Sequence, residues 1–207
     1  MIEYKTGSIF DSGAPILVNP VNTVGVMGAG LALTFRLIFP KMFERYKEIC
    51  DQSLFHPGQL WLWTMSRRWS VLNFPTKKHY RDWTEPYILE AGLQKFVETY
   101  RERGVWWIAF PILGAGHGKM KKEDSLFLMT KYLEPLPDCK VEIWEPDNQN
   151  DSPDTLWQEF QSHYTEADTT FARIVMACSG FDQLAAWRGV SKQKISKEIS
   201  EKLSIEL

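Results

Sequence analysis

Short apolar runs alternate along the chain with segments of helical periodicity, and this alternation limits the fold more than any other feature. Six runs, rich in β-branched and aromatic residues and bounded by Gly, Pro or Asn, predict strands: IEYK, PILVNPV, LWLW, SVLNF, VWWIAF and VEIWE. A helix is predicted over residues 85–102, because four apolar residues recur at helical spacing between Thr84, a candidate N-cap, and Gly104. This alternation predicts an α/β fold in which helices cover a mixed sheet.

Size and composition indicate one intracellular domain with an appendage. The 207 residues are 44% apolar and 14% aromatic, which is enough for a full core. The net charge of -2 argues against a wholly basic nucleic-acid binder but allows a local basic surface. Three widely spaced cysteines indicate neither a disulfide framework nor a zinc site, so we expect no metal and no cofactor. The N-terminus does not resemble a signal peptide and no apolar run is long enough to cross a membrane, so we expect a cytoplasmic protein without a membrane partner.

The composition changes after Glu145, which places a domain boundary near residue 148. Acidic residues dominate from Val141 to Asp168, where there is no Lys or Arg, and residues 148–168 therefore predict an exposed acidic linker. Residues 169–207 contain both charge signs and two helical patterns, which predict a small helical C-terminal region.

This C-terminal region allows two interpretations. The spacing of Ala185, Gly189, Val190 and Ile195 is that of a helix-turn-helix, in which the glycine makes the turn. A small helical cap that packs its apolar residues against another surface explains the pattern equally well.

Two glycine-rich loops follow predicted strands. In NPVNTVGVMGAGLALTFRLIFPK, residues 19–41, a strand ends in asparagines and a glycine loop leads to a helix that starts at about Ala29. Backbone N–H groups and a helix N-terminus can then face an anion, although a tight strand-to-helix turn explains a single such loop as well. FPILGAGHGKM, residues 110–120, repeats the arrangement. Two such loops favour a clamp around a diphosphate.

Cations gather where another predicted strand ends. The stretch NFPTKKHYR, residues 73–81, places two lysines, a histidine and an arginine directly after a buried run. Ligands of α/β sheets bind beyond the carboxyl ends of the strands, so these cations are expected to face an anionic ligand. A solvated loop is the alternative for the outer cations.

In this order, the three motifs resemble those of the macrodomains, the ADP-ribose-binding α/β/α modules. Within that family they are most similar to the DarG type, which removes ADP-ribose from thymidine in single-stranded DNA. The resemblance covers residues 1–147 and implies a three-layer α/β/α fold with a mixed central sheet, followed by the short helical appendage. It also implies ADP-ribose and ADP-ribosylated single-stranded DNA as ligands, and a DarT-like toxin as the partner whose modification is reversed.

The resemblance assigns roles to individual residues. Lys77 becomes the catalytic residue, and Asn22 holds the distal ribose. The implied substrate-binding residues are Ser8, Ile9, Asn19, Asn22, Met27, Gly28, Ala29, Gly30, Thr76, Leu113, Gly114, Ala115, Gly116, His117 and Gly118. The candidates for nucleic-acid contact are Lys78, His79, Tyr80 and Arg81. Beside the anomeric carbon, Lys77 would protonate or stabilise the departing base, or attack as an amine.

Two positions depart from the family pattern. Ser8 stands where macrodomains often carry the aspartate that binds adenine. Gly118 stands where relatives that act on protein carboxylates carry a second-loop aspartate, and this favours the DNA-directed branch. Two alternatives remain: a noncatalytic ADP-ribose reader or sensor, and a hydrolase of ADP-ribosylated protein or of ADP-ribose esters.

Overall fold

The computed structural model describes residues 1–64 and 70–146. The predicted acidic linker, residues 148–168, and the predicted helical region, residues 169–207, lie outside the described residues. Across the described part of the chain, no helix is both long enough and apolar enough to span a membrane.

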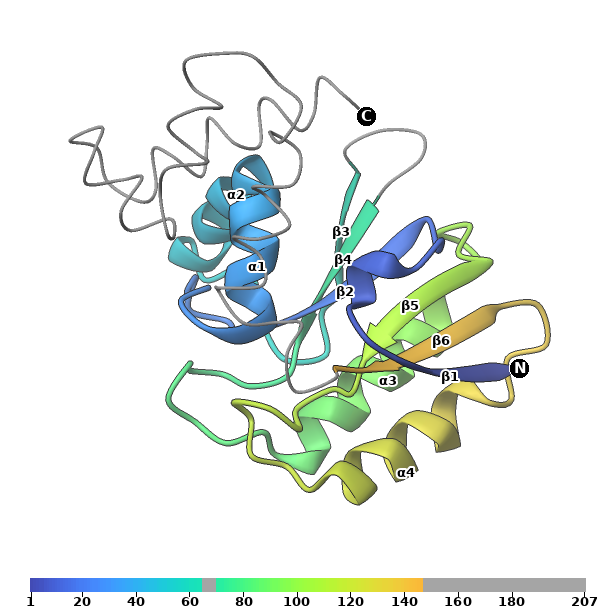
Figure 1. Cartoon of the computed structure of the whole chain (residues 1–207). Coiled ribbons are helices and arrows are strands. Elements are labelled where there is room, and N and C mark those ends of the chain that lie inside the picture. The colour runs from blue at the N-terminus through green and yellow to red at the C-terminus, as the bar shows by residue number, and fades with distance from the viewer. Residues whose placement is uncertain (65–69, 147–207) are drawn as a thin grey trace, which may run out of the picture.

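A mixed sheet of six strands forms the centre of the described domain (Figure 1). Its strands are β1 (Ile2–Thr6), β2 (Ile16–Val21), β3 (Trp61–Thr64), β4 (Ser70–Pro75), β5 (Trp107–Pro111) and β6 (Lys140–Glu145). In space they are ordered β1-β6-β5-β2-β4-β3, and all pairs are parallel except the edge pair β3–β4. The six predicted strands and the mixed sheet are confirmed.

Helices cover both faces of this sheet. Helices α1 (Gly30–Ile38) and α2 (Pro40–Asp51) lie on one face, and α3 (Pro86–Thr99) and α4 (Lys122–Leu133) lie on the other (Figure 1). A short 3-10 helix, η1 (Ile9–Asp11), follows β1. The three-layer α/β/α architecture is therefore confirmed, and α1 begins one residue after the predicted start.

The start of α3 differs from the prediction. Its N-cap is Glu85 rather than Thr84, and it gains no side-chain cap. The backbone N–H of Thr84 instead donates to the carbonyl oxygen of Gly118 (2.8 Å), so tertiary contact takes this residue out of the helix. The helix ends at Thr99, and the chain then turns through Gly104, whose φ of +67° suits a residue without a side chain.

Each face of the sheet has its own hydrophobic core. Phe74 and Phe110 pack with α3 and α4, and the ring of Phe96 meets Phe110 edge to face. Gly92 lets α3 approach β4 closely, since a Cβ there would lie 2.4 Å from Cζ of Phe74. On the opposite face, Tyr46 of α2 belongs to the second core and has no exposed surface.

A buried carboxylate fastens η1 to the sheet. Glu142 of β6 accepts hydrogen bonds from the Ser12 hydroxyl (2.6 Å), the Trp107 indole (3.0 Å) and the Trp144 indole (2.9 Å). Burial acts to raise the pKa of Glu142, but these donors and Lys140 outweigh it, so the pKa lies below its ordinary value. Glu142 is therefore an ionised structural anchor that fixes the segment after β1.

Candidate active site

The loops that follow four parallel strands lie together at the carboxyl ends of these strands. Strands β1, β2, β4 and β5 all run in the same direction, so residues 7–11, 22–30, 76–85 and 112–121 converge beyond their carboxyl ends (Figure 1). All predicted site residues except Asn19 lie on these loops. We call the last three the first glycine loop (22–30), the lysine loop (76–85) and the second glycine loop (112–121).

Asn22 organises the first glycine loop. Its Oδ1 accepts hydrogen bonds from the N–H groups of Val24 (3.1 Å) and Val26 (3.2 Å), and its Nδ2 donates to the carbonyl oxygen of Val26 (2.5 Å). The buried Tyr46 hydroxyl donates to the Asn22 carbonyl oxygen (2.7 Å), and lies 3.1 Å from Oδ1. Burial raises the pKa of Tyr46, which keeps the phenol neutral and able to donate. These bonds leave one N–H of the Asn22 amide unused, and Tyr46 is a supporting residue that no sequence motif pointed to.

The first glycine loop ends at the N-terminus of α1. The N-cap, Ala29, offers no side-chain acceptor, and the first turn contains no acidic residue. Gly30 has a φ of +56°, a left-handed conformation that favours glycine. Gly28 and Ala29 are exposed, whereas Met27 is buried beneath them. The first N–H groups of α1 are therefore free of side-chain caps, as a site for an anion requires.

Asn19 lies deeper than the other predicted residues. It is fully buried within β2, and its Nδ2 donates to Oδ1 of Asn73 on β4 (3.0 Å). Within the described residues its own Oδ1 has no hydrogen-bond partner. Asn19 thus links the two strands that carry the first glycine loop and the lysine loop.

The lysine loop docks on the first glycine loop through its backbone. The N–H of Thr76 donates to the carbonyl oxygen of Val21 (2.9 Å), and the N–H of Thr23 donates to that of Lys78 (2.9 Å). The Thr23 hydroxyl also reaches the Lys78 carbonyl (3.0 Å). These bonds fix the backbone on either side of Lys77.

Lys77 is buried, with 8% of its surface exposed. Its Nζ donates to three backbone carbonyl oxygens, those of Tyr80 (3.1 Å), Asp82 (3.3 Å) and His117 (3.0 Å). These acceptors use all three donors of an ammonium group. Burial lowers the pKa of Lys77, the charge of Asp82 opposes this shift, and the charge of Lys119 adds to it. Among the described residues, no carboxylate forms an ion pair with this ammonium.

The second glycine loop closes over Lys77 and packs on Thr84. A Cβ at Gly118 would lie 2.2 Å from Oγ1 of Thr84 and 2.4 Å from the carbonyl oxygen of Gly114, so only glycine fits there. A Cβ at Gly30 would lie 2.7 Å from Cδ2 of His117. The two glycine loops therefore meet at Gly30 and His117, as the prediction of a two-sided clamp requires.

Ser8 and Ile9 lie in the remaining loop, residues 7–11, which follows β1. The Ser8 hydroxyl accepts the N–H of Phe10 (3.3 Å) and so caps η1, while its own proton stays available. Ile9 is buried in the core beneath. Neither position supplies the carboxylate that the family pattern places here.

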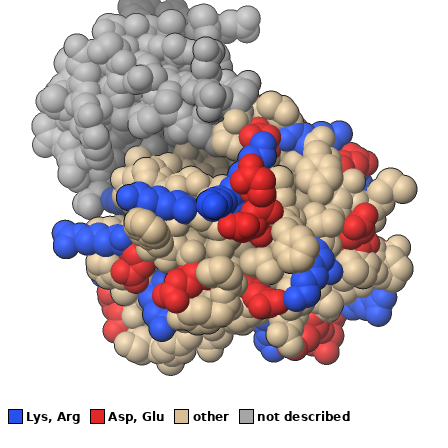
Figure 2. Space-filling model, turned by 90° about the horizontal axis from the view of Figure 1, so that it is seen from below, with Lys and Arg blue, Asp and Glu red and all other residues tan. Residues whose placement is uncertain are grey.

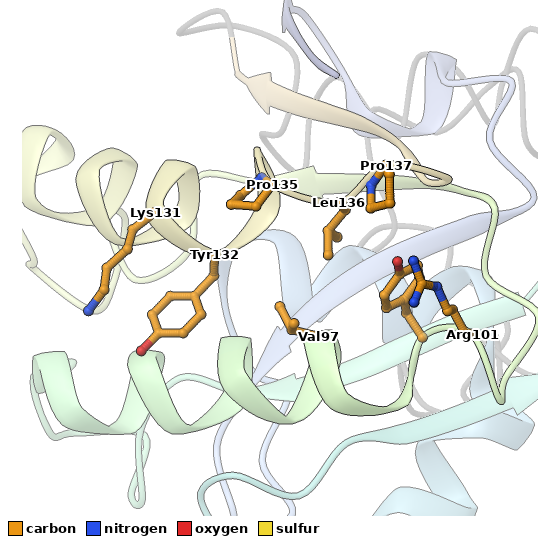
Figure 3. Close-up of a pocket in the computed structure, with 8 residues that line it drawn as sticks. Val97, Arg101, Lys131, Tyr132, Pro135, Leu136 and Pro137 are labelled. Atoms are coloured by element: carbon orange, nitrogen blue, oxygen red, sulfur yellow. The ribbon is translucent and has the colours of Figure 1, made fainter.

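One pocket of the described domain lies away from the candidate site. A pocket of about 330 Å³ lies between the C-terminal ends of α3 and α4 (Figure 3), and no predicted site residue lines it. Its lining consists of Val97, Tyr100, Arg101, Lys131, Tyr132, Pro135, Leu136 and Pro137. In residues 1–64 and 70–146, no cluster of His, Cys, Asp and Glu is positioned to hold a metal ion.

The fold and the clamp of glycine loops define a macrodomain. The model of the macro domain family matches residues 18–129, and the chain belongs to this family. A Mycobacterium tuberculosis protein named "DNA ADP-ribosyl glycohydrolase" is 34% identical over 149 residues, which are 70% of this chain and 42% of that protein.

Two solved structures are similar over the same region. The macrodomain of Thermus aquaticus DarG is 34% identical, with a TM-score of 0.66 over 70% of this chain and 99% of that one. Thermosipho africanus DarTG in complex with ADP-ribose is 30% identical, with a TM-score of 0.63 over 69% of this chain and 42% of that one. The chain thus spans about two fifths of the length of the full-length relatives it matches.

Proposed function

We propose that this protein removes ADP-ribose from nucleic acid, with thymidine-linked ADP-ribose in single-stranded DNA as its substrate. The observation that carries the proposal is the ammonium of the buried Lys77, which the carbonyl oxygens of the lysine loop and of His117 in the second glycine loop hold. The name of the Mycobacterium tuberculosis relative and the ADP-ribose complex of the Thermosipho africanus relative support it.

In this proposal each of the convergent loops binds a different part of ADP-ribose. The diphosphate lies against the uncapped N-terminus of α1 and is covered by residues 113–118, because backbone N–H groups at both places can donate to it. The distal ribose lies near the remaining N–H of Asn22. Adenine lies toward Ser8 and Ile9, where a hydroxyl replaces the usual carboxylate.

Lys77 then acts in its charged form. Breaking the bond between the anomeric carbon and the thymine nitrogen leaves the electron pair on nitrogen. One N–H of the ammonium turns from its carbonyl oxygen toward this nitrogen and donates its proton to it. Water adds to the anomeric carbon and returns a proton to the lysine, so the group is regenerated. Burial lowers the pKa of Lys77 and makes this proton easier to give. Attack as an amine would require Nζ to lose its proton and leave the three carbonyl oxygens.

Other ADP-ribose linkages fit the site less well. Gly118 leaves no space for the second-loop aspartate that relatives acting on protein carboxylates carry. A reader without activity would need the glycine loops and Asn22, but it would gain nothing from a desolvated ammonium beside the ligand. The buried Lys77 therefore favours a hydrolase over a reader.

The substrate implies a transferase that supplies it. We propose a DarT-like toxin as that partner, because the modification removed here must first be attached. A Thermosipho africanus relative, 31% identical over 159 residues, is named as a fusion of DNA ADP-ribosyl transferase and glycohydrolase.

A comparison of linkages tests the proposed function. The purified chain is incubated with a single-stranded oligonucleotide carrying ADP-ribose on thymidine and, separately, with a peptide carrying it on glutamate, and free ADP-ribose is measured. Release from the oligonucleotide alone is expected. Release from the peptide alone would assign the protein-linked substrate, and binding of ADP-ribose without any release would assign a reader. Borohydride trapping of a protein adduct would reveal amine attack in place of proton donation.

A further inference from the structure

Three exposed aromatic side chains lie on the lysine loop and directly after it. Tyr80, Trp83 and Tyr87 are 42%, 65% and 50% exposed. Large exposed rings in one place mark a binding surface more often than chance exposure does. Here they occupy the loop that carries Lys77 and the first turn of the helix that follows it, α3.

Each of these rings has a cation beside it. The Arg81 guanidinium lies 5.4 Å from the Tyr80 ring, Nζ of Lys119 lies 5.4 Å from the Trp83 ring, and Nζ of Lys78 lies 5.8 Å from the Tyr87 ring. The ring of His79 also packs against that of Tyr80, with centroids 4.2 Å apart and the two planes tilted by 34°. We call Tyr80, Trp83, Tyr87 and their three cations the aromatic–cation strip.

The strip is joined to the reacting group through the backbone. The carbonyl oxygens of Tyr80 and Asp82 both accept hydrogen bonds from Nζ of Lys77. Lys119 comes from the second glycine loop, so its contact with Trp83 bridges the two loops on the outside of the site. The backbone that carries Tyr80 therefore also holds the ammonium of Lys77, so the strip and the catalytic candidate are parts of one loop arrangement.

Lys119 occupies its place against its own backbone preference. Its φ is +56°, in the left-handed region where a glycine would be relaxed and a lysine is strained. Its neighbour Gly118 and the preceding Gly116 fit this loop, whereas Lys119 is the residue that carries the strain. Strain kept at the mouth of a site points to use of the side chain there.

Charge alone does not explain the strip. Asp82 and Glu85 are exposed beside its cations, and the chain as a whole carries a charge of -2. Figure 2, which shows the molecule from below, displays acidic and basic side chains side by side, with extended Lys and Arg side chains projecting at its left edge. A ligand bound here is therefore held mainly by stacking, with phosphate contacts as a smaller contribution.

We propose that the aromatic–cation strip binds the unpaired bases next to the modified thymidine, so that it, rather than the ADP-ribose clamp, selects single-stranded nucleic acid. The inference rests on the proposed function, which it deepens. Every base has a face that can stack on tyrosine or tryptophan, whereas a paired duplex hides these faces. Lys78, Arg81 and Lys119 provide cations for the phosphates between the bases.

Fluorescence anisotropy with an unmodified, labelled single-stranded oligonucleotide tests the strip. Trp83→Ala is expected to weaken binding by roughly 5- to 160-fold, the range for losing one stacked base. Trp106→Ala is the matched control. Trp106 is 61% exposed, but it precedes β5 and therefore lies at the amino-terminal end of that strand, away from the loops of the candidate site. A duplex of the same sequence is expected to bind more weakly than the single strand.

Lys119→Gly separates binding from folding. The variant is expected to keep or raise the melting temperature, because it relieves the left-handed strain, and to weaken oligonucleotide binding. Its plot of log affinity against log salt is expected to be shallower by about 0.7, the value of one phosphate contact on a single strand. A variant that is more stable yet binds less cannot be explained by unfolding.

The outcomes distinguish this inference from the proposed function. Equal oligonucleotide binding by the wild type, Trp83→Ala and Lys119→Gly would overturn the strip, even if ADP-ribose were still released from DNA. Loss of oligonucleotide binding in both variants, with unchanged calorimetric affinity for free ADP-ribose, would support the strip even if no release were seen. Trp83→Ala could instead weaken the binding of an ADP-ribosylated peptide and leave the binding of the oligonucleotide unchanged. That result would assign the surface to protein substrates and overturn the inference.

Discussion

Two glycines of the second glycine loop, Gly116 and Gly118, offer a matched pair of substitutions. Neither has a left-handed backbone, so alanine at either position tests space alone. A Cβ at Gly116 meets nothing within 4 Å, whereas one at Gly118 would lie 2.2 Å from Oγ1 of Thr84 and 2.4 Å from the carbonyl oxygen of Gly114. Gly118→Ala must therefore move the loop, and Gly116→Ala need not.

The cost of Gly118→Ala follows from the contacts it breaks. Overpacking costs about 1–3 kcal/mol, and a lost backbone hydrogen bond about 0.5–1.5 kcal/mol. Two such bonds depend on the loop position, from Thr84 N–H to Gly118 (2.8 Å) and from Met120 N–H to Gly114 (3.1 Å). The free energy of unfolding should fall by about 2–6 kcal/mol, and by less if the loop swings away instead. Gly116→Ala should change it by less than about 0.5 kcal/mol.

Urea unfolding and calorimetric titration with ADP-ribose check both variants. Gly116→Ala is expected to be as stable as the wild type but to bind ADP-ribose more weakly, because a methyl group would stand where the proposed function places the phosphates. Gly118→Ala is expected to lose both stability and binding. Wild-type stability and wild-type affinity in Gly118→Ala would refute the packing of this loop described above.

Three further changes test the supports of the site. Tyr46→Phe removes a donor from Asn22, and we expect the unfolding free energy to fall by about 1–2 kcal/mol and ADP-ribose affinity to fall with it, in urea titration and calorimetry. Glu142→Gln should lower the free energy of unfolding of the domain at neutral pH. Since folding lowers the pKa of Glu142, the stabilisation exists above its unfolded pKa and disappears as the pH falls through its folded pKa, so wild type and variant should converge in acid. Gly92→Ala should lower the melting temperature, because its Cβ would meet the ring of Phe74.

The sequence predicted the sheet well because its strands are short, apolar and bounded by strong breakers. The runs ending at Val21, Pro75 and Pro111 each lead into a polar or glycine-rich stretch, so both the strands and the convergence of the loops that follow them could be anticipated. The error at Thr84 has a different origin. Its local sequence favours an N-cap, but the second glycine loop, more than 25 residues later, claims its backbone N–H.

The supporting contacts could not be read from the sequence, since they join residues that are distant along the chain. No local pattern connects Tyr46 with Asn22, or places the carbonyl oxygen of His117 on Nζ of Lys77. Lys119 likewise looks like an ordinary loop cation, and only its positive φ and its contact with Trp83 distinguish it. Local motifs thus predicted which loops form the candidate site, whereas tertiary packing determines how its groups are held.

The most direct test of the central claim concerns Lys77 itself. Single-turnover release of ADP-ribose from thymidine-linked single-stranded DNA is measured for the wild type, Lys77→Ala and Lys77→Gln, with affinity for free ADP-ribose measured in parallel. Lys77→Gln keeps an N–H donor for the carbonyl oxygens but carries no ammonium, so it separates loop support from proton donation. We expect release to slow by about 10²–10⁴-fold in both variants, with ADP-ribose affinity retained in Lys77→Gln. Wild-type release by Lys77→Gln would contradict the assignment of Lys77 as the catalytic group.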